Sequence, residues 1–338
     1  MKNNKIIIIA EAGGNHNGSL KKAFKLVDIA KRAKADYVKF QTFTANTLVS
    51  VNAPKANYQE KNVKKTSHYQ MIKNLEMSEE MHKKVYLYCK KKKIKFLSSV
   101  FSVSSLKLLK KFKTDFIKIP SGEITNLPLL IAVGKFNKST ILSTGMSSII
   151  EIKNAIKILT KSGLIKKKIT LLQCNTEYPT PFKDVNLKVI QSLKKLFNVQ
   201  VGYSDHTNGI EAAIASASLG ACVIEKHFTI SKKLPGPDHK ASLEPHELEI
   251  MVKSIRNVEL ALGDNKKKVS KSEKKNIPIA RKSIYASKII KKGEKFNSRN
   301  LITLRPALGL SPMEIFKLYK KKAKKNYDKG DIILEKIK

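Results

Sequence analysis

Two histidines in the second half of the chain stand at the ends of short apolar runs. Residues 201–206 read VGYSDH, and residues 222–227 read CVIEKH. If both runs are parallel strands, His206 and His227 lie at the same edge of one sheet, where α/β proteins bind ligands. Two imidazoles with added oxygen ligands suit a divalent metal that keeps open positions. For a strand-end pair taken alone, hydrogen-bonded caps are the commoner interpretation, so the neighbouring residues must decide.

Three carboxylates stand near such strand ends and could move protons. Glu225 precedes His227 by two residues, which places both side chains on one face of a strand. Glu11 ends another apolar run, and Glu123 follows a third. Each could act as a general acid or base. Each could instead pair with a buried lysine, and the sequence does not rank the three carboxylates as acid and base.

Two lysines interrupt apolar runs and indicate an anionic ligand. Lys39 lies in YVKFQTF and Lys118 lies in FIKIPS. Strand alternation places Lys39 and Gln41 on the same face. A buried ammonium without a partner lowers its pKa or destabilises the fold, and a bound phosphate removes the problem. Hydroxyl groups that could complete a phosphate site occur in equivalent places at Ser121, Ser143 and Ser204.

The segments that must position these residues repeat eight times as an apolar run, a polar tip and a helical stretch. The runs are 5–11, 36–42, 95–101, 116–121, 140–145, 169–175, 200–206 and 221–229. Helix-period segments between them include 20–34, 78–93, 102–113, 148–163 and 208–219. Strands that alternate with helices form parallel βαβ units. Eight units predict a (β/α)8 TIM barrel over residues 1–263. An open doubly wound sheet is the second choice, but its usual GxGxxG turn is absent.

The chain changes character after Gly263. Residues 264–281 are polar and basic, which predicts a linker or an exposed arm. Residues 282–338 contain three β-like runs, around SIYASKII, LITLRP and DIILEKI. This stretch is too short for a second barrel. It predicts a small, mostly-β module whose core is marginal unless the module docks on something.

The composition narrows the classes of partner. The chain has 338 residues and a formal net charge of +40, yet only five of its 67 basic residues are arginines. The lysines are scattered and there is no Trp, so a solvated lysine surface explains the charge better than nucleic-acid binding does. The three cysteines form no metal or disulfide pattern, and no apolar run could span a membrane or serve as a signal peptide. We therefore expect a cytoplasmic protein that binds neither nucleic acid nor membrane.

A set of motifs resembles one known family. In chain order they are EAGGNHNG (11–18), KFQTF (39–43), KIPSGEITNLPLL (118–130), LSTGM (142–146), CNTEYPTPF (174–182), GYSDHT (202–207), EKHFT (225–229) and GPDHKASLEP (236–245). Together they resemble the sialic acid synthase family, which includes N-acetylneuraminate and N,N'-diacetyllegionaminate synthases. The segments RKSIYASKIIKKGEKF and LITLRPALGLSP resemble that family's C-terminal SAF (antifreeze-like) domain. The likeness covers nearly the whole chain.

The resemblance implies a reaction. Phosphoenolpyruvate adds through its C3 to the aldehyde of N-acetylmannosamine or a related N-acylated hexosamine, and phosphate leaves. The product is N-acetylneuraminate or a related nonulosonate. The alternative substrate is a 6-deoxy diacetamido sugar, which gives N,N'-diacetyllegionaminate or pseudaminate. The resemblance further implies a divalent metal, Mn2+ or Mg2+, and a domain-swapped homodimer.

The resemblance also implies roles for individual residues. It implies that His206 and His227 bind the metal. It implies that phosphoenolpyruvate is bound by Lys39, Lys118, Ser121, Ser143, Ser204 and Thr176. It implies that the sugar is bound by Gln41, Tyr178, Asp238 and Arg305, with Arg305 presented by the partner subunit. The catalytic candidates are Glu225, Glu11 and Glu123.

The sequence departs from the family pattern near two of the predicted site residues, and two other functions are compatible with the same fold. Val100 stands where the family commonly has proline, although the hydroxyl of Ser99 is kept, and Asn175 stands where threonine is usual. The second change leaves the phosphate contact near Thr176 open. A non-catalytic barrel of the same fold would be expected to lose metal or phosphate positions, and none is lost. An aldolase of the Schiff-base type would use a lysine such as Lys118, but the histidine pair and phosphate groups favour metal chemistry.

Overall fold

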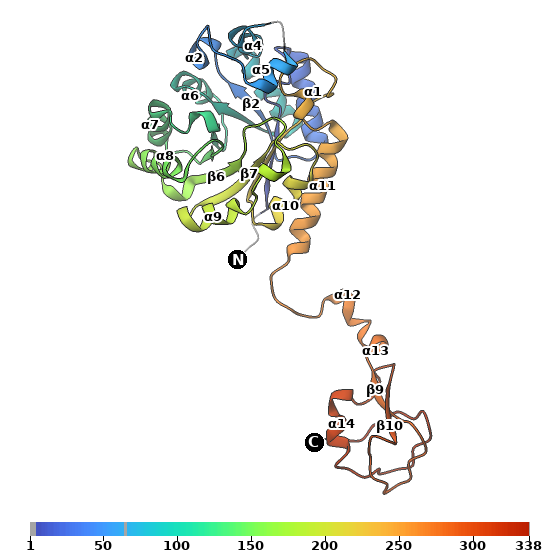
Figure 1. Ribbon diagram of the computed structural model, residues 1–338. Helices are drawn as coiled ribbons and strands as arrows, with labels where there is room; N and C mark the ends of the chain where they lie inside the picture. Colours follow the sequence, from blue (N-terminus) through green and yellow to red (C-terminus); the bar gives the residue numbers. More distant parts are fainter. Residues whose placement is uncertain (1–4, 64–65, 338) are drawn as a thin grey trace. The chain divides into compact units, whose positions relative to one another are not determined.

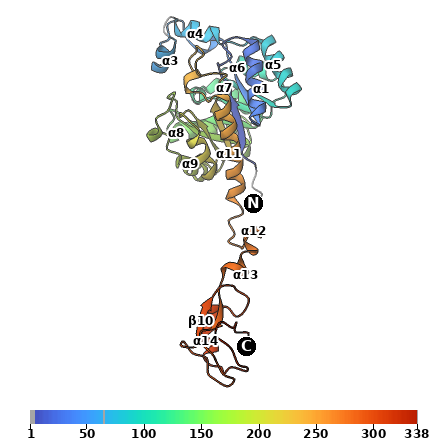
Figure 2. The same cartoon turned by 90° about the vertical axis from the view of Figure 1, so that its right-hand side faces the viewer.

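The computed structural model describes residues 5–63 and 66–337. The chain divides into two compact units, Met1–Gly263 and Asp264–Lys338. The first unit is a ring of strands enclosed by helices, and the second is small and mostly irregular (Figures 1 and 2).

Eight parallel strands of the first unit close into a barrel in their order along the chain. They are β1 (Ile7–Glu11), β2 (Tyr37–Thr42), β3 (Lys95–Val100), β4 (Ile117–Ile119), β5 (Thr140–Ser143), β6 (Ile169–Cys174), β7 (Gln200–Asp205) and β8 (Val223–His227). β1 pairs with both β2 and β8, which closes the ring. Each strand lies within one of the eight predicted runs, and the predicted (β/α)8 barrel is confirmed.

Helices cover the outside of this barrel (Figure 1). Those that follow the predicted repeat are α1 (Leu20–Arg32), α5 (Glu79–Lys92), α6 (Val103–Leu109), α7 (Leu127–Phe136), α8 (Ile149–Lys161), α9 (Val189–Phe197), α10 (Glu211–Ser218) and α11 (Pro245–Leu262). Several begin at a serine whose hydroxyl accepts a hydrogen bond from the backbone N–H three residues on, as at Ser19, Ser78 and Ser148. Such caps satisfy N–H groups that the first helical turn leaves unpaired.

Three short helices interrupt the repeat between β2 and α5. They are α2 (Ala45–Leu48), α3 (Asn57–Asn62) and α4 (His68–Asn74). The sequence analysis predicted none of them, because this stretch lacks the strand-then-helix pattern. Side chains from α3 and α4 line the pocket described below.

The barrel interior is apolar at its base and polar toward the C-terminal ends of its strands. Its buried apolar cluster consists of Ile9, Tyr37, Leu97, Ile141, Leu172 and Val223. Two residues further along the same strands stand Glu11, Lys39, Ser99, Ser143, Cys174 and Glu225. Because every second residue of a strand points to the same face, the polar set lies directly above the apolar cluster. A larger apolar layer joins the outer faces of the strands to the helices.

The second unit has an apolar core of its own. β9 (Ser283–Ala286) pairs antiparallel with β10 (Leu301–Leu304). Ile284, Phe296 and Tyr327 are among the buried side chains that pack together there. These side chains form one contiguous cluster, so the second unit has a hydrophobic core of its own.

Two details of the second unit differ from the sequence expectation. The third β-like run contributes only an isolated bridge between Tyr285 and Ile332. The stretch predicted as a linker contains two single helical turns, α12 (Lys271–Lys274) and α13 (Ile277–Ala280), and a third turn, α14 (Ile315–Leu318), lies later. Ser270 caps α12 and Pro278 stands at the start of α13, which explains why these turns form in a polar stretch.

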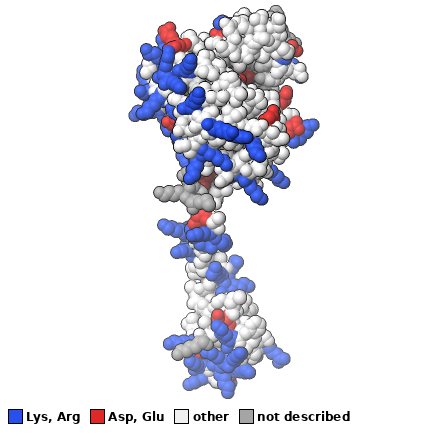
Figure 3. Space-filling model, turned by 90° about the vertical axis from the view of Figure 1, so that its left-hand side faces the viewer, with Lys and Arg blue, Asp and Glu red and all other residues white. Residues whose placement is uncertain are grey.

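Basic side chains stand in several separate groups on the face shown in Figure 3, with neutral surface between the groups on the first unit. This distribution agrees with the expectation of a solvated lysine surface. Among the described residues, no helix is both long enough and apolar enough to cross a membrane.

Candidate active site

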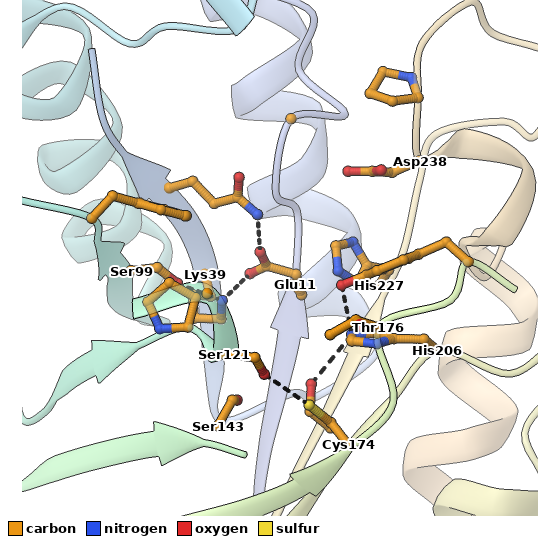
Figure 4. A pocket seen from close by; sticks show the side chains of 18 of the residues that line it. Glu11, Lys39, Ser99, Ser121, Ser143, Cys174, Thr176, His206, His227 and Asp238 are labelled. Atoms are coloured by element: carbon orange, nitrogen blue, oxygen red, sulfur yellow. Dashed lines mark hydrogen bonds and ion pairs between the residues drawn. The ribbon is translucent and has the colours of Figure 1, made fainter. Parts of the chain in front are cut away.

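A pocket opens at the C-terminal ends of the barrel strands (Figure 4). Most of the residues assigned from the sequence line it, namely Glu11, Lys39, Gln41, Lys118, Ser121, Ser143, Thr176, Tyr178, Ser204, His206, Glu225, His227 and Asp238. They come from seven of the eight strands or from the segments that follow them, and Ser99 of β3 lines the same pocket, so the closed barrel is what brings them together.

Two buried lysines meet one carboxylate on the pocket floor. The Nζ atoms of Lys39 and Lys118 lie 3.6 and 3.3 Å from the Oε1 atom of Glu225. Ser204 donates a hydrogen bond to the same oxygen at 3.0 Å. The Nζ atom of Lys39 also lies 2.8 Å from the Oε2 atom of Glu11. The two cations are therefore balanced inside the protein, and an incoming anion has to share them with these carboxylates.

These contacts give the two carboxylates different proton affinities. Burial raises the pKa of Glu11 to about 7, because the Lys39 charge offsets only part of the desolvation and the Glu225 charge adds repulsion. Burial also acts on Glu225, but Lys118 and Lys39 outweigh it and lower the pKa of Glu225 to about 2. Near neutral pH Glu225 stays ionised, whereas Glu11 exchanges its proton. Such a separation is the usual basis for assigning an acid–base role.

Hydroxyl groups and a backbone N–H surround the lysines. Lys39 donates a hydrogen bond to the Oγ atom of Ser99 at 2.9 Å, and the N–H of Gly145 donates to Ser121 at 3.0 Å. A Cβ atom at Gly145 would lie 2.9 Å from the Ser121 hydroxyl, so only glycine allows this close approach. The Ser143 hydroxyl is buried and has no hydrogen-bond partner among the described residues. Because a buried hydroxyl without a partner is costly, this wall is suited to the oxygens of an anionic ligand.

The two histidines face each other beside the lysines, with ring centroids 5.4 Å apart. The Nδ1 atom of His206 donates to the backbone carbonyl of Asn175, a contact that assigns the proton to Nδ1 and leaves a lone pair on Nε2. The Nδ1 atom of His227 is buried without a hydrogen-bond partner among the described residues. Burial lowers the pKa of His206 to about 4 and holds the pKa of His227 well below its usual value. Both rings are therefore neutral at pH 7, which is the form that binds metals.

This pair fits the divalent cation that the family resemblance implies. It offers the Nε2 lone pair of His206, which among the described side chains only hydroxyl groups approach, and an unsatisfied buried nitrogen on His227. In residues 5–63 and 66–337, no group of three or more His, Cys, Asp or Glu side chains gathers to hold a metal. A cation held here would thus take two protein ligands of these types and keep positions open for other oxygens.

Tyr178, which was predicted to bind the sugar, lies against the histidines. Its ring stacks on His206 with centroids 4.1 Å apart, and its hydroxyl lies 3.1 Å from the Nε2 atom of His206. Tyr58 lines the same pocket, with its ring centroid 5.1 Å from that of Tyr178. The Tyr178 hydroxyl and a cation would therefore compete for the same lone pair.

The predicted sugar ligands Gln41 and Asp238 both line the pocket. Gln41 donates a hydrogen bond from Nε2 to Glu11 at 3.0 Å. Burial raises the pKa of Asp238, on the loop after β8, to about 6. The loop is anchored to the segment after β1, because the side chains of Asn15 and Asn17 donate to the carbonyls of Phe228 and Pro235 at 2.8 and 2.7 Å.

An apolar wall on one side of the pocket was missed by the sequence analysis. Met71, Ile72 and Leu75 from α4 and its C-terminal end form it together with Phe43 and Phe101. The spacing of Met71, Ile72 and Leu75 is that of one helix face. A search for helices outside the strand-then-helix repeat would have found this signal.

Two residues predicted for the site, Glu123 and Arg305, are not among those that line the pocket. Glu123 ends a helical turn after β4, and its Oε2 atom accepts a hydrogen bond from the side chain of Asn126 at 2.6 Å. It does not line the pocket, because the turn directs its side chain toward the start of α7. Its position therefore does not support the predicted catalytic role. Arg305 belongs to the second unit, where it is exposed directly after β10.

Comparison with known proteins gives likenesses over almost the full length. The sequence model of the NeuB family matches residues 26–267. The chain is 52% identical to the N,N'-diacetyllegionaminic acid synthase of Campylobacter jejuni, over 98% of this chain and 99% of that protein. It is 42% identical to the enzyme of the same name from Legionella pneumophila, over 97% of this chain and 93% of that protein. It is 38% identical to a pseudaminic acid synthase of C. jejuni, over 98% and 96% of the two chains.

A solved structure agrees with these relatives. The crystal structure of N-acetylneuraminic acid synthetase from Leptospira borgpetersenii, in complex with citrate, matches with a TM-score of 0.70 and 34% identity. The match covers 81% of this chain and 91% of that chain. The resemblance to sialic acid synthases is thereby confirmed, and the chain belongs to the NeuB family.

Proposed function

We propose that this enzyme condenses phosphoenolpyruvate with 2,4-diacetamido-2,4,6-trideoxymannose and water to give N,N'-diacetyllegionaminate and phosphate. The observation that carries the proposal is the composition of one pocket. Two buried lysines, a carboxylate with a pKa of about 7 and a pair of neutral histidines all open onto it. Such a set can hold an anionic substrate, exchange a proton and orient a carbonyl compound.

Lys39 and Lys118 bind the phosphate of phosphoenolpyruvate in this proposal. Their ammonium groups share the single oxygen Glu225 Oε1 at 3.6 and 3.3 Å, and Lys39 also contacts Glu11 at 2.8 Å, so Lys118 shares its nearest carboxylate with a second cation. A dianion that approaches both cations gains two charge-assisted contacts. The unpartnered hydroxyl of Ser143 and the hydroxyl of Ser121 supply further hydrogen bonds.

His206 and His227 hold the divalent cation in this proposal. When bound, Mn2+ or Mg2+ supplies Lewis-acid polarisation of the sugar's carbonyl oxygen. The protein's own contribution is to keep both imidazoles neutral and to fix the His206 ring through the Asn175 carbonyl.

Glu11 moves the protons of the reaction. Attack of phosphoenolpyruvate C3 on the aldehyde carbon forms the new C–C bond and leaves negative charge on the former aldehyde oxygen. Glu11 starts protonated and gives its proton to that oxygen. Water then adds to the electron-deficient C2 and returns one proton to Glu11. The C2 hydroxyl oxygen becomes the keto oxygen as the C–O bond to phosphate breaks, and the hydroxyl proton leaves with the phosphate. A carboxyl group with a pKa of about 7 is suited to both transfers, and its proton count is restored at the end.

The apolar wall favours the 6-deoxy diacetamido sugar over N-acetylmannosamine. Met71, Ile72, Leu75, Phe43 and Phe101 present no hydrogen-bonding side-chain groups to the pocket. A substrate with a C6 methyl and two acetamido methyl groups buries apolar area against them, at about 0.8 kcal/mol per methylene-sized group. The 6-hydroxyl group of N-acetylmannosamine would lose hydration against such a wall. The names of the two most identical relatives reported above support the same choice.

Phosphate release tests the proposal. Phosphoenolpyruvate and Mn2+ are incubated with the enzyme and either sugar, with and without EDTA. We expect release that requires a sugar and stops with EDTA, and a kcat/KM for the 6-deoxy sugar about 10-fold or more above that for N-acetylmannosamine. Equal or better turnover of N-acetylmannosamine would name that sugar instead. No release with either sugar, in protein shown to be folded, would overturn the condensation itself.

The assembly is proposed on the family resemblance. We infer a domain-swapped homodimer in which Arg305 of one copy serves the sugar site of the other. The exposure of Arg305 on a unit with its own core is compatible with that role. The guanidinium would donate to an N-acyl oxygen of the sugar.

A further inference from the structure

A buried ion pair lies directly behind the two histidines, on the outer face of the same strands. Asp205 precedes His206 and Lys226 precedes His227, and the two residues are Cα partners in the β7–β8 register. Alternation points Asp205 and Lys226 away from the pocket while the histidines point into it. Both charged side chains have an exposed fraction of 0%.

Lys226 binds the chain on both sides of His206. Its Nζ atom lies 2.8 Å from the Oδ2 atom of Asp205 and donates to the backbone carbonyl of Thr207 at 2.6 Å. The side chain of Lys226, the residue before His227, therefore contacts the residues on both sides of His206. The β7–β8 ladder already pairs Asp205 with Lys226, but β7 ends at Asp205, so it is the Lys226 side chain that extends this link past His206 to Thr207.

The Asp205 carboxylate completes the arrangement. Its Oδ1 atom accepts hydrogen bonds from the Thr207 N–H at 2.9 Å, from the Thr207 hydroxyl at 2.8 Å and from the Tyr203 hydroxyl at 3.1 Å. These bonds fix the turn that carries the chain through His206. The network uses both carboxylate oxygens, so the charge is well solvated by the protein.

Stability alone does not account for such a pair. Removing two ions from water costs more free energy than their attraction returns in many proteins, and apolar replacements of similar volume are often neutral or stabilising. A buried ion pair can instead fix the relative position of the two chain segments that it joins. Here the geometry that it fixes is the separation and orientation of two imidazoles 5.4 Å apart between ring centroids.

We propose that Lys226 is a positioning residue for the divalent-cation site, which sets the spacing of His206 and His227 through Asp205 and Thr207. This inference rests on the proposed cation role of the two histidines. It predicts that loss of Lys226 weakens cation binding even where the barrel remains folded, because the imidazoles no longer hold one spacing.

The test measures Mn2+ binding to the full chain without substrates, by titration calorimetry, together with the thermal midpoint by circular dichroism. For Lys226→Met we expect an Mn2+ dissociation constant raised about 10- to 100-fold, the range known for residues that orient metal ligands. Asp205→Asn keeps the shape of the carboxylate, and we expect a smaller rise in the same constant.

A matched control uses a second buried polar network on the outer face of the barrel. The Thr42 hydroxyl bonds the Nε2 atom of His82 at 2.9 Å and the Ser98 hydroxyl at 2.7 Å, and it lies on β2, away from the histidine pair. Thr42→Val should lower the thermal midpoint and leave Mn2+ affinity within about two-fold, since buried hydrogen bonds act on stability.

The double variant Asp205→Leu/Lys226→Met separates positioning from stability. Its apolar pair should restore or raise the thermal midpoint, while Mn2+ affinity stays as weak as in the single variant. If Lys226→Met is folded and binds Mn2+ within two-fold of the wild type, the positioning role is wrong. If the single variant does not fold, the same criterion applies to the double variant. If the wild-type chain itself binds no Mn2+, the cation role of the histidines is wrong and this inference falls with it.

Discussion

Glu11 and Glu225 show how surroundings set the chemistry of two identical carboxyl groups. Both are buried at the mouth of one barrel, on the neighbouring strands β1 and β8. Glu225 faces two lysines and has a pKa lowered to about 2, whereas Glu11 has one close lysine and a pKa raised to about 7. Of these two carboxyl groups, Glu11 is the one that changes its protonation state near neutral pH. At the scale of single residues, the difference in pKa therefore follows from how many lysines each carboxylate faces.

The pH profile of the reaction should report the protonation state of Glu11. Because the protonated form gives the first proton, kcat/KM should fall as the pH rises through about 7. Glu11→Gln removes the titrating group, so we expect a rate about 10²- to 10⁴-fold lower without that inflection. Glu123→Gln is the matched control and should keep the wild-type profile, since Glu123 lies outside the pocket. A profile that is unchanged in Glu11→Gln would contradict the assignment.

Lys118 should matter for phosphoenolpyruvate more than for the sugar. Burial lowers the pKa of Lys118. Among the described residues, the Glu225 carboxylate opposes this shift most, and its Oε1 atom lies 3.3 Å from the ammonium. An anionic substrate gives this ammonium a second partner. We expect Lys118→Met to raise the KM for phosphoenolpyruvate about 30- to 1000-fold, as for loss of a buried charge-assisted contact, and to change the KM for the sugar far less. Exposed Lys83→Met should change neither constant, and equal effects on both substrates would speak against a phosphate role for Lys118.

At the scale of elements, α4 is the part of the fold that should set the choice of sugar. It places Met71 and Ile72 in the pocket wall, and Leu75 follows at its C-terminal end. Ile72→Ser introduces a hydrogen-bonding group there at small cost, because Ile72 is only partly buried. We expect the ratio of kcat/KM for the 6-deoxy sugar to that for N-acetylmannosamine to fall about 5- to 50-fold.

The control for this change is an apolar residue of the same barrel outside the pocket. Leu87→Ser, on the exposed side of α5, should leave the ratio unchanged. If Ile72→Ser lowers both kcat/KM values equally, the wall holds the substrate without selecting it.

The elements also show what the sequence could and could not reveal. Strand periodicity predicted the eight strands and the inward direction of Lys39, Gln41 and Glu225. It could not predict that Lys118 and Glu225 meet, because β4 and β8 are not neighbours and their side chains touch only across the closed barrel. The position of Glu123 depended on the turn after β4, which periodicity does not describe.

Other features were hidden for a different physical reason. The α4 wall lies in an insertion outside the repeat, so the repeat gave no expectation for it. Lys226 reads as one more lysine in a lysine-rich chain, and only its burial beside Asp205 distinguishes it. Lysine burial depends on tertiary packing, which composition does not report.

At the scale of the whole molecule, the proposed homodimer predicts that Arg305 of one copy serves the sugar site of the other copy. Mixing two inactive variants tests this prediction. Arg305→Ala and Glu11→Gln are coexpressed with different affinity tags, and the hybrid is purified through both tags. If Arg305 serves the other copy's pocket, the hybrid has one intact site out of two and should regain about half of the wild-type rate per dimer.

The alternatives give other outcomes. Each variant purified alone should stay inactive. A hybrid with no activity and a confirmed dimeric mass would mean that Arg305 has no role in the sugar site of a second copy. A monomeric wild-type chain with full activity would contradict the proposed assembly.

The fate of the bridging oxygen of phosphoenolpyruvate tests the central claim most directly. The enzyme is supplied with phosphoenolpyruvate labelled with 18O at the C2 oxygen, together with Mn2+ and the 6-deoxy diacetamido sugar, and the released phosphate is analysed by mass spectrometry. We expect that phosphate carries the label and is released only with the sugar, because in the proposed reaction water adds to C2 and the C–O bond breaks after C–C bond formation. Unlabelled phosphate, or labelled phosphate released without any sugar, would contradict it.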